Sequence, residues 1–249
     1  MNVHTLSIGT NYLGTMSELA GCVNDANDLY SLCKPKVKTA TKLIGTKADR
    51  QGMVDTFRKV RYRLEKPGDL LFVSLSSHGT NEDGCQGVVG NDFEVIWDYE
   101  MDAAIVDRLA GTYVVFLLDC CHADGLKKGR VIGVHMPGPS QKSIPIERCK
   151  SHPRLEANTS RAKVDCGFIA GCLEGGYSYD GRFNGRPNGA LTYYTLRAWK
   201  ELKRGATFND LFNRIGGKRP KGYLPSVDYP QQPTKFGSAK NFARKMPFK

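Results

Sequence analysis

The chain has 249 residues, of which 40% are hydrophobic and 24% are charged, a composition typical of a globular protein. This composition excludes collagen-like, coiled-coil and disordered chains, and no stretch approaches the roughly 18 uncharged apolar residues that a membrane helix needs. The first residues lack the charged start and long apolar run of a secretory signal. We therefore expect a cytoplasmic protein with no membrane partner.

The basic residues are concentrated in two segments. Thirty-six Lys and Arg against 25 Asp and Glu give a net charge of +11. Residues 126–163 hold nine bases and two acids, and residues 234–249 hold five bases and no acid. The rest of the chain is close to neutral, so we do not expect a general nucleic-acid binder. For the C-terminal bases we favour a role in solubility and flexibility.

The cysteines do not form a recognisable disulfide framework. There are eight, without any CxxC spacing, in a chain without an export signal. Free thiols are therefore expected, and most of them should pack in the core, because free Cys behaves as a small hydrophobe. The adjacent pair Cys120-Cys121 does not fit that description.

Strand and helix patterns alternate along the chain. In chain order, the expected elements are a strand over 3–8, a helix over 21–33, a strand over 36–44, a helix over 47–64, a strand over 70–75, a hairpin over 87–97, a helix over 100–109, strands over 113–118 and 163–170, and helices over 190–202 and 208–215. This alternation predicts an α/β fold with a mostly parallel central sheet flanked by helices on both faces. We expect a single domain over 1–238, followed by a basic C-terminal tail over 239–249.

Two of the expected strands are continuous apolar runs that end in reactive side chains. Residues 70–75 (LLFVSL) and 113–118 (YVVFLL) have the pattern of parallel strands that are buried on both faces. The first run is followed by Ser76-Ser77-His78-Gly79 and the second by Asp119-Cys120-Cys121-His122. A parallel sheet places its ligand site at the carboxyl ends of its strands, so these clusters meet there if the two strands are neighbours.

A histidine and a cysteine at one sheet edge indicate cysteine peptidase chemistry, which needs a thiolate and a nearby imidazole. Alternation along a strand makes Asp119 and Cys121 project together, while Cys120 points away. The amide of Gly79 is a candidate oxyanion donor. An anion at Asp119 would raise the thiol pKa, so a positive histidine would be needed in compensation. The weaker alternative is a zinc site, with ligands from His78, Cys120, Cys121 and His122.

The sequence resembles the metacaspases and their prokaryotic relatives, which are caspase-like cysteine peptidases. The resemblance covers residues 3–125 and, more loosely, 163–238. Residues 76–79 match the family's S-x-H-G motif. Residues 119–122 match the first four positions of its D-x-C-H-x-G motif, although two residues, rather than one, separate His122 from Gly125. The resemblance implies a caspase–hemoglobinase-like fold with His78 and Cys121 as the catalytic dyad.

A third match concerns substrate binding. Residues 21–26 (GCVNDA) resemble the family's G-C-x-x-D-A, which implies that Asp25 and Asp119 line the S1 pocket with Cys22 and Ser76 alongside. Two carboxylates favour Arg or Lys as the P1 residue. The QAC[RQG]G signature of true caspases is absent, so cleavage after Asp is not expected. Weaker matches are residues 189–192 (GALT) and 231–233 (QQP).

Two features depart from the family pattern. Many metacaspases bind calcium through several Asp residues, but here the stretch after His78-Gly79 has few acids, and Lys127 and Lys128 follow the nucleophile. We expect no obligatory cofactor, with Ca²⁺ as the alternative. The basic segment 126–163 also offers many Lys and Arg bonds close to the nucleophile, so we expect a processing loop; the alternative is an exposed loop that happens to be basic.

Taken together, the residues and the resemblance predict a cysteine endopeptidase that cleaves protein or peptide substrates after Arg or Lys, acts as a monomer and is matured by cleavage in the basic loop. One alternative is an inactive caspase-like scaffold that binds a partner through its basic segments. Another is a nucleic-acid-associated protein anchored by its tail.

Overall fold

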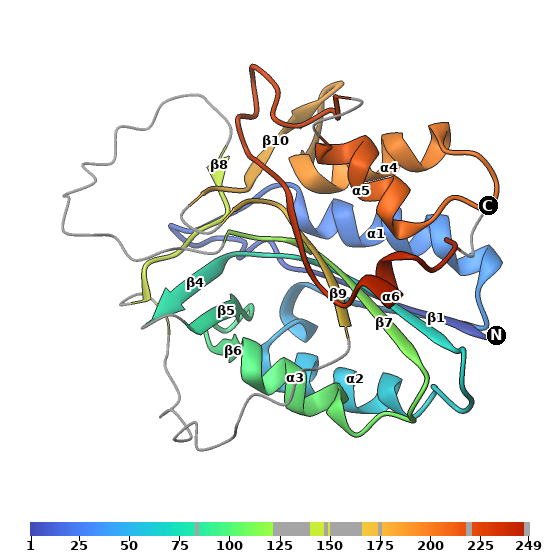
Figure 1. The fold of residues 1–249 in the computed structure, drawn as a ribbon. Helices are drawn as coiled ribbons and strands as arrows, with labels where there is room; N and C mark the ends of the chain where they lie inside the picture. Colours follow the sequence, from blue (N-terminus) through green and yellow to red (C-terminus); the bar gives the residue numbers. More distant parts are fainter. Residues whose placement is uncertain are drawn as a thin grey trace.

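A computed structural model describes residues 1–82, 85–121, 140–146, 149, 166–173, 176–217 and 221–246. Strands and helices alternate along the described chain (Figure 1). The strands are β1 (Val3–Gly9), β2 (Thr39–Ile44), β3 (Leu70–Ser76), β4 (Gly79–Glu82), β5 (Cys85–Val89), β6 (Val95–Trp97), β7 (Tyr113–Asp119), β8 (Ser140–Gln141), β9 (Cys166–Ala170), β10 (Tyr179–Phe183), β11 (Arg186–Gly189) and β12 (Thr234–Gly237). The helices are α1 (Cys22–Cys33), α2 (Arg50–Arg61), α3 (Asp98–Val106), α4 (Ala190–Glu201), α5 (Phe208–Gly216) and α6 (Ala239–Phe242), with short 3₁₀ turns at Lys34–Lys36 and Gly45–Lys47.

The main sheet has six strands in the order β12-β9-β7-β3-β1-β2. All neighbouring pairs are parallel except β12 with β9, which are antiparallel at one edge. The apolar strands β3 and β7 lie side by side in the middle, and their last residues, Ser76 and Asp119, are paired in register. The predicted mostly parallel α/β sheet is therefore confirmed, and the two central strands are neighbours as the site prediction required.

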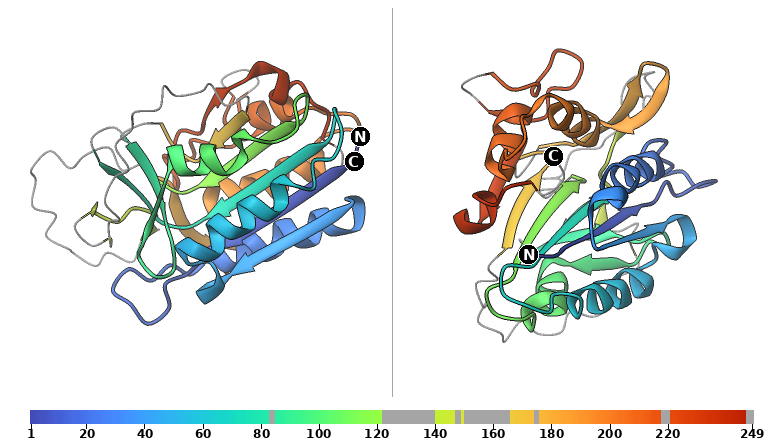
Figure 2. Two further views of the ribbon diagram at one scale, coloured as in Figure 1. Left: turned by 90° about the horizontal axis from the view of Figure 1, so that it is seen from below. Right: turned by 90° about the vertical axis from the view of Figure 1, so that its right-hand side faces the viewer.

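Helices cover both faces of this sheet (Figure 2). On one face, α1, α4, α5 and α6 contribute buried side chains such as Leu29, Trp199 and Phe208 to a large apolar cluster. On the other face, α2 and α3 contribute Phe57 and Ile105 to a second cluster. Burial on both faces explains why β3 and β7 are continuous apolar runs rather than alternating ones.

The element boundaries differ from the predicted ones for local reasons. The strand expected from residue 36 begins at Thr39, because Lys34–Lys36 forms a 3₁₀ turn that contains Pro35. The helix expected from residue 47 begins at Arg50, because the Asp49 side chain accepts a hydrogen bond from the Gly52 amide (2.6 Å) and caps it. Residues 163–165 of the expected strand 163–170 lie outside the described residues.

Several short elements were not predicted. They include β4, which extends the expected hairpin into a three-stranded sheet with β5 and β6, and a second three-stranded sheet of β11, β10 and β8. These strands have two to five residues and polar composition, which leaves little periodic signal. The second small sheet stands above the carboxyl ends of the main strands and carries much of the site described below.

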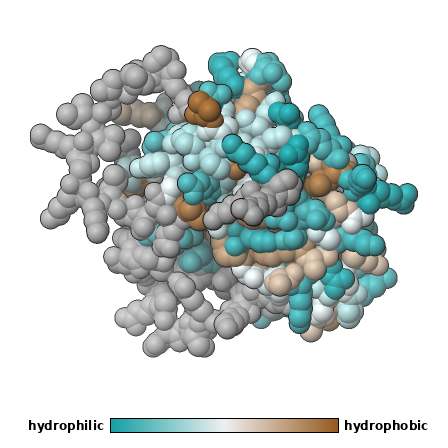
Figure 3. Space-filling view, turned by 45° about the horizontal axis from the view of Figure 1, so that its top comes forward, coloured by the Kyte–Doolittle hydropathy of each residue, from teal (hydrophilic) through white to brown (hydrophobic). Residues whose placement is uncertain are grey.

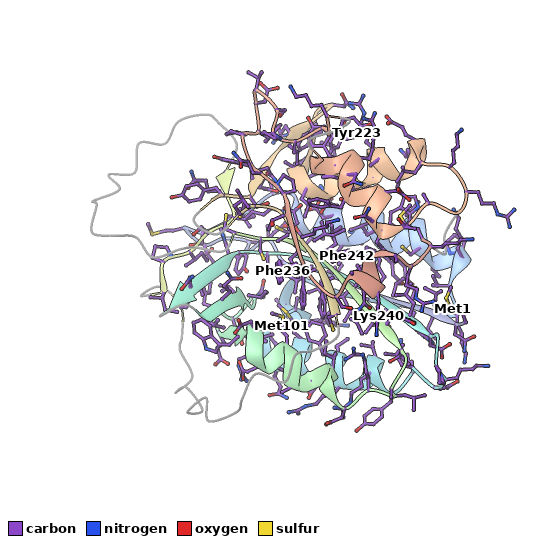
Figure 4. The ribbon with its side chains drawn as sticks, viewed as in Figure 1. Met1, Met101, Tyr223, Phe236, Lys240 and Phe242 are labelled. Carbon is purple, nitrogen blue, oxygen red and sulfur yellow. The ribbon has the colours of Figure 1, made fainter. Side chains whose placement is uncertain are left out.

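The segment after residue 238 packs onto the domain instead of leaving it. Asn241 is fully buried and accepts a hydrogen bond from the Val114 amide of β7 (2.9 Å). Phe242 of α6, labelled in Figure 4, and Met246 are buried in the cluster on the α1 face. Residues 239–246, which we expected to be tail, therefore belong to the domain, and residues 247–249 lie outside the described residues.

The face shown in Figure 3 is mainly hydrophilic, with hydrophobic residues in small separate groups. Exposed large apolar side chains include Leu13 and Met16 in the loop between β1 and α1 and Val227 in a loop far along the chain. None of the described helices has the length and apolar character needed to cross a bilayer.

Candidate active site

The ends of β3 and β7 bring the predicted site residues to one edge of the sheet. His78 and Gly79 follow β3, and Cys121 follows β7. The side chains of His78 and Cys121 are at most 3% exposed, and Gly79 is buried as well. A Cβ atom at position 79 would collide with the Cys121 carbonyl oxygen, so the close approach of these two segments requires glycine. His122 and Gly125, which completed the sequence motif, lie outside the described residues.

A short extended segment of the basic region, residues 140–144, runs through this edge. Ser140 and Gln141 form β8, which pairs antiparallel with Asp180 and Tyr179 of β10. The Lys142 amide then donates to the Ser178 carbonyl (3.0 Å). Beyond it, Ser143 forms a parallel bridge with Gly79. The segment is therefore hydrogen-bonded as a strand to the protein on both sides of Lys142.

The side chain of Lys142 is fully buried in a pocket formed by Asp25, Ser76, Asp119 and Gly189, which we call the Lys142 pocket. Its Nζ lies 2.7 Å from Ser76 Oγ, 3.3 Å from Asp25 Oδ2 and 3.2 Å from Asp119 Oδ1. It also donates to the Asp119 carbonyl oxygen (3.3 Å). The ammonium group thus exchanges its hydration shell for oxygen acceptors, two of them carboxylates, which is what a buried lysine needs.

Both carboxylates of the pocket are held by further hydrogen bonds. Asp25, in the first turn of α1, accepts from Ser76 Oγ (2.6 Å), Asn188 Nδ2 (2.9 Å) and the Gly189 amide (3.0 Å). Asp119 accepts from Ser178 Oγ (2.7 Å) and from the amide and hydroxyl of Thr192 (2.9 and 2.8 Å).

The chain around the start of α4 explains the sequence match at 189–192. The Thr192 amide lies in the first turn of α4, where helix amides lack partners, so Asp119 completes that helix end from another element. A Cβ atom at position 189 would collide with the Asp119 carboxylate and with Lys142 Nζ. Glycine at this position is therefore what leaves room for a lysine side chain.

Charge and burial oppose each other in the Lys142 pocket. Burial raises the pKa of Asp25, while the ammonium group of Lys142 lowers it, and the balance is a pKa of about 7. Burial lowers the pKa of Lys142, but Asp119, Cys22 and Asp25 outweigh it, so this pKa is well above its usual value. Lys142 therefore carries its charge in the pocket at neutral pH.

The carbonyl group of Lys142 faces the amide of Gly79, which the sequence indicates as an oxyanion donor, and also the amide of Cys121. Its oxygen accepts a hydrogen bond from the Gly79 amide (3.0 Å) and from the Cys121 amide (3.1 Å). Two convergent backbone donors at this distance are the arrangement that stabilises a developing negative charge on a carbonyl oxygen.

The His78 ring is held from two directions. Its Nε2 lies 2.7 Å from the Ser17 carbonyl oxygen. Because a carbonyl only accepts, Nε2 carries the proton and Nδ1 is the basic nitrogen. Nδ1 is buried and has no hydrogen-bond partner among the described residues. Burial lowers the pKa of His78 to about 4, although the backbone of Lys142 beside the ring acts in the opposite direction. The imidazole is thus neutral at pH 7.

Tyr12 forms the other support of His78. Its ring lies 4.8 Å from the imidazole, and its hydroxyl donates to the Val89 carbonyl (2.6 Å) and accepts from the His78 amide (3.2 Å). Tyr12 itself is 1% exposed and has a φ of 53°, a left-handed conformation that is uncommon for residues other than glycine. Such a conformation in a buried residue persists only where its surroundings hold it.

The two adjacent cysteines point to opposite sides, as expected. Cys120 is buried in the apolar cluster between the sheet and α2–α3. The Cys121 sulfur accepts a hydrogen bond from the Ser178 amide (3.0 Å) and donates to the Ser178 carbonyl (3.3 Å), so it lies on the side of Asp119 and Lys142. Burial raises the pKa of the Cys121 thiol above its usual range, and the neighbouring Cys172 adds to the shift. The expected positive histidine is therefore not present in this state: thiol and imidazole are both neutral.

The structure offers little for a metal ion. Among the residues it describes, no group of three His, Cys, Asp or Glu side chains is arranged to hold one. Cys120 cannot join His78 and Cys121, because it lies in an apolar cluster on the other side of the sheet. Asp92, from the stretch after His78, accepts hydrogen bonds from the amides of Arg50 and Glu94. These observations do not fit the zinc alternative. The expectation of no obligatory cofactor, with Ca²⁺ as the alternative, stays a prediction.

Several residues of the site were not recognised in the sequence. Lys142 was counted only as one base of the processing segment, and Ser178, Asn188 and Tyr12 were not named. The only available signal was the G-A-L-T match at 189–192, which turned out to mark the pocket wall. The other contacts join residues more than 50 positions apart, which periodicity does not reveal.

Comparison with known families places the chain in a class. The caspase domain family model matches residues 3–234, so the chain belongs to the caspase domain family. A crystal structure of a protein from Geobacter sulfurreducens superimposes with a TM-score of 0.71 over 100% of this chain and 98% of that one, at 23% identity. That likeness supports the fold.

The curated relatives are metacaspases. Metacaspase-7 and Metacaspase-6 of Arabidopsis thaliana are 32% and 31% identical to this chain over 146 and 144 residues, which are 51% and 49% of this chain. Metacaspase-1 of Plasmodium falciparum is 31% identical over 47% of it. The matched regions span only 36%, 38% and 23% of these relatives. The family and the relatives support a caspase-type cysteine peptidase.

Proposed function

We propose that this protein is a cysteine endopeptidase that cleaves after Lys or Arg, and that its first substrate is its own Lys142–Ser143 bond. The observation that carries the proposal is the double placement of Lys142. Its ammonium group lies between Asp25 and Asp119, and its carbonyl oxygen lies on the amides of Gly79 and Cys121. A residue bound at both its side chain and its carbonyl in this way resembles a bound P1 residue.

The proposed P1 preference follows from the Lys142 pocket. Two carboxylates and the Ser76 hydroxyl suit a terminal cation, and an arginine fork can engage both carboxylates at once. An acidic P1 side chain would instead place three carboxylates together without a cation, which is strongly unfavourable in a buried site. Cys22, the first residue of α1, is fully buried and stays part of the proposed substrate site.

In the proposed mechanism Cys121 is the nucleophile and His78 the acid–base. The Cys121 sulfur attacks the carbonyl carbon of residue 142, and its proton passes to Nδ1 of His78. The amides of Gly79 and Cys121 stabilise the oxyanion. His78 then protonates the departing amine of Ser143, and an acyl-enzyme thioester remains. Water deprotonated by His78 hydrolyses this thioester and restores the thiol.

Maturation follows from the same geometry. Before cleavage, Lys142 fills the pocket that an external P1 residue would need. Hydrolysis converts residue 142 into a chain end with a free carboxylate, which no longer has the covalent connection that holds residues 140–144 across the site. The segment can then leave, and the pocket becomes accessible to other substrates. Proteolysis at 142 is therefore both the first turnover and the step that opens the site.

Mass spectrometry of the purified chain tests this proposal. The wild-type protein should yield fragments ending at 142 and beginning at 143. Cys121→Ala and Lys142→Gln should not yield them, whereas Lys142→Arg should. Lys128→Gln, which changes another base of the same segment, is the matched control and should cleave normally. Cleavage that persists at 142 in Cys121→Ala would assign the event to another protease.

A covalent probe separates the peptidase from an inactive scaffold. A peptidyl chloromethylketone with Lys at P1 should alkylate Cys121 in the cleaved protein, and the label should be absent in Cys121→Ala. A cleaved wild-type protein that neither reacts with this probe nor hydrolyses Lys or Arg peptides would overturn the proposed peptidase activity and favour the scaffold.

A further inference from the structure

The residue two positions beyond Lys142 occupies a pocket of its own. Ile144 is 1% exposed and belongs to a cluster of buried apolar side chains, to which Tyr12, Leu19, Val89 and the partly buried Phe93 also belong, together with Cys22 and Cys149. We call the four side chains of Tyr12, Leu19, Val89 and Phe93 the Ile144 pocket. It is separate from the two large clusters on the faces of the sheet, and it lies beside the site because the Tyr12 ring also contacts His78.

Backbone hydrogen bonds fix which residue reaches this pocket. The Gly79 amide donates to the Lys142 carbonyl (3.0 Å), and the Ile144 amide donates to the Gly79 carbonyl (3.1 Å). One residue, Gly79, therefore sets the position of the chain on both sides of the Lys142–Ser143 bond. In an extended segment, residues two apart face the same side, so Lys142 and Ile144 enter neighbouring pockets and Ser143 points away.

From this geometry we infer that the enzyme has an apolar S2′ subsite, the Ile144 pocket, which selects substrates with an aliphatic residue two positions after the scissile bond. The inference rests on the proposed function, because it takes residues 140–144 as bound in the manner of a substrate. At Ile144, the segment is hydrogen-bonded through its backbone amide. The four side chains of the pocket are apolar, except for the Tyr12 hydroxyl.

The Ile144 pocket disfavours charged and strongly polar P2′ side chains. The Tyr12 hydroxyl is already used, since it donates to Val89 O and accepts from His78 N. A charged or strongly polar P2′ side chain would therefore lose its hydration without gaining a partner among these residues. The loop that supplies Tyr12 and Leu19 also supplies Ser17, whose carbonyl holds His78. A poorly fitting P2′ residue is thus expected to disturb turnover as well as binding.

One coumarin substrate and one series of peptides test the inference on the cleaved enzyme. The first is acetyl-Ser-Gln-Lys-aminomethylcoumarin, which has no residue after the scissile bond other than the dye. The second is an internally quenched peptide with the sequence Ser-Gln-Lys-Ser-X-Pro, in which X is Ile, Val, Ala, Gly or Asp. We expect kcat/KM to fall roughly 10-fold or more from Ile to Gly, and further for Asp, since small changes in an apolar pocket have effects of this size.

Variants of the enzyme locate the preference. Leu19→Ala should reduce the ratio of kcat/KM for X = Ile over X = Gly several-fold, because it removes one wall of the pocket. Leu13→Ala, an exposed leucine of the same loop, should leave that ratio unchanged. In the precursor, Ile144→Asp should slow cleavage at 142, whereas Ile144→Val should not.

The outcomes separate the two proposals. Cleavage of the coumarin substrate together with equal cleavage of all X peptides would overturn the S2′ subsite and leave the proposed function intact; Ile144 would then be only a core residue of the precursor. A ratio unchanged by Leu19→Ala would also overturn it. If neither substrate is cleaved, the proposed function fails and the inference fails with it.

Discussion

The Lys142 pocket and the proposed catalytic pair, His78 and Cys121, lie next to each other but are built in opposite ways. In the pocket, the carboxylates of Asp25 and Asp119 accept hydrogen bonds from donors on β3, β11 and α4 and from Ser178, in addition to the ammonium group. The catalytic pair has few partners: His78 Nδ1 has none among the described residues, and the Cys121 sulfur contacts the backbone of Ser178.

This difference separates recognition from chemistry. A pocket whose groups are all satisfied is rigid, so it fixes the P1 residue before any bond is broken. One imidazole nitrogen has no partner among the residues that the structure describes, and burial keeps both members of the pair neutral. In the proposed mechanism, we therefore expect proton transfer from sulfur to nitrogen to accompany attack on the carbonyl group rather than precede it.

The largest expected effect on activity comes from removing a member of the proposed catalytic pair. His78→Ala removes the proton acceptor while the Lys142 pocket stays complete, so kcat for Lys peptides should fall by roughly 10⁴-fold or more. Precursor cleavage at 142, followed by gel electrophoresis over time, should slow to the same extent. An activity within 10-fold of wild type would contradict the assignment of His78.

Removing one charge from the pocket should have a smaller effect. Asp119→Asn keeps an acceptor for Thr192 but loses the anion beside the P1 cation, so kcat/KM for Arg and Lys peptides should fall by about 10²-fold, mainly through KM. Asp55→Asn, which changes an exposed carboxylate on α2 that pairs with Arg58, is the matched control. Equal kcat/KM values for Asp119→Asn and wild type would remove Asp119 from P1 recognition.

Tyr12 tests whether the imidazole must be held. Tyr12→Phe keeps the ring beside His78 but deletes the hydroxyl that joins the His78 amide to the Val89 carbonyl. We expect kcat to fall on the order of 10-fold with KM unchanged, because the ring becomes less well positioned. Tyr62→Phe, at a tyrosine that is 73% exposed, should have no effect. A change in KM alone would indicate that Tyr12 acts on binding and not on His78.

The smallest effect concerns stability and pH. Burial lowers the pKa of His78 from 6.5 to about 4. The neutral ring therefore contributes stability that is fully present above pH 6.5 and lost as pH falls toward 4. In the uncleaved Cys121→Ala protein, the free energy of unfolding should drop by roughly 1 kcal/mol between pH 7.5 and pH 6 on account of this group.

Urea unfolding of Cys121→Ala with and without His78→Gln isolates that contribution. Asp25 acts in the opposite direction, because its raised pKa makes the folded state gain stability as pH falls from about 7. Asp25 is present in both proteins, so the difference between their pH profiles reports His78 alone. Identical profiles would mean that the ring titrates normally in the folded protein.

Local sequence patterns predict the strands and the position of the site, whereas contacts between distant residues could not be predicted. The apolar runs before Ser76 and Asp119 predict buried neighbouring strands, and the polar residues after them predict where the site lies. The role of Lys142 could not be predicted, because nothing near position 142 distinguishes it from the other bases of its segment. Its burial depends on Gly189, Ser178 and Asp25, which are distant in sequence and meet only in the folded chain. For the same reason, the packing of Asn241 against Val114 was missed.

Under the proposed function, the extended segment of residues 140–144 has a kinetic consequence. A peptide that belongs to the same chain is present beside the nucleophile at a local concentration set by its tether, however dilute the protein is. Scission of Lys142–Ser143 should therefore be first order, with a half-time that does not change on dilution. External peptides must compete with this resident strand until it is cut, so a burst of precursor would reach full activity after a delay determined by the chain itself.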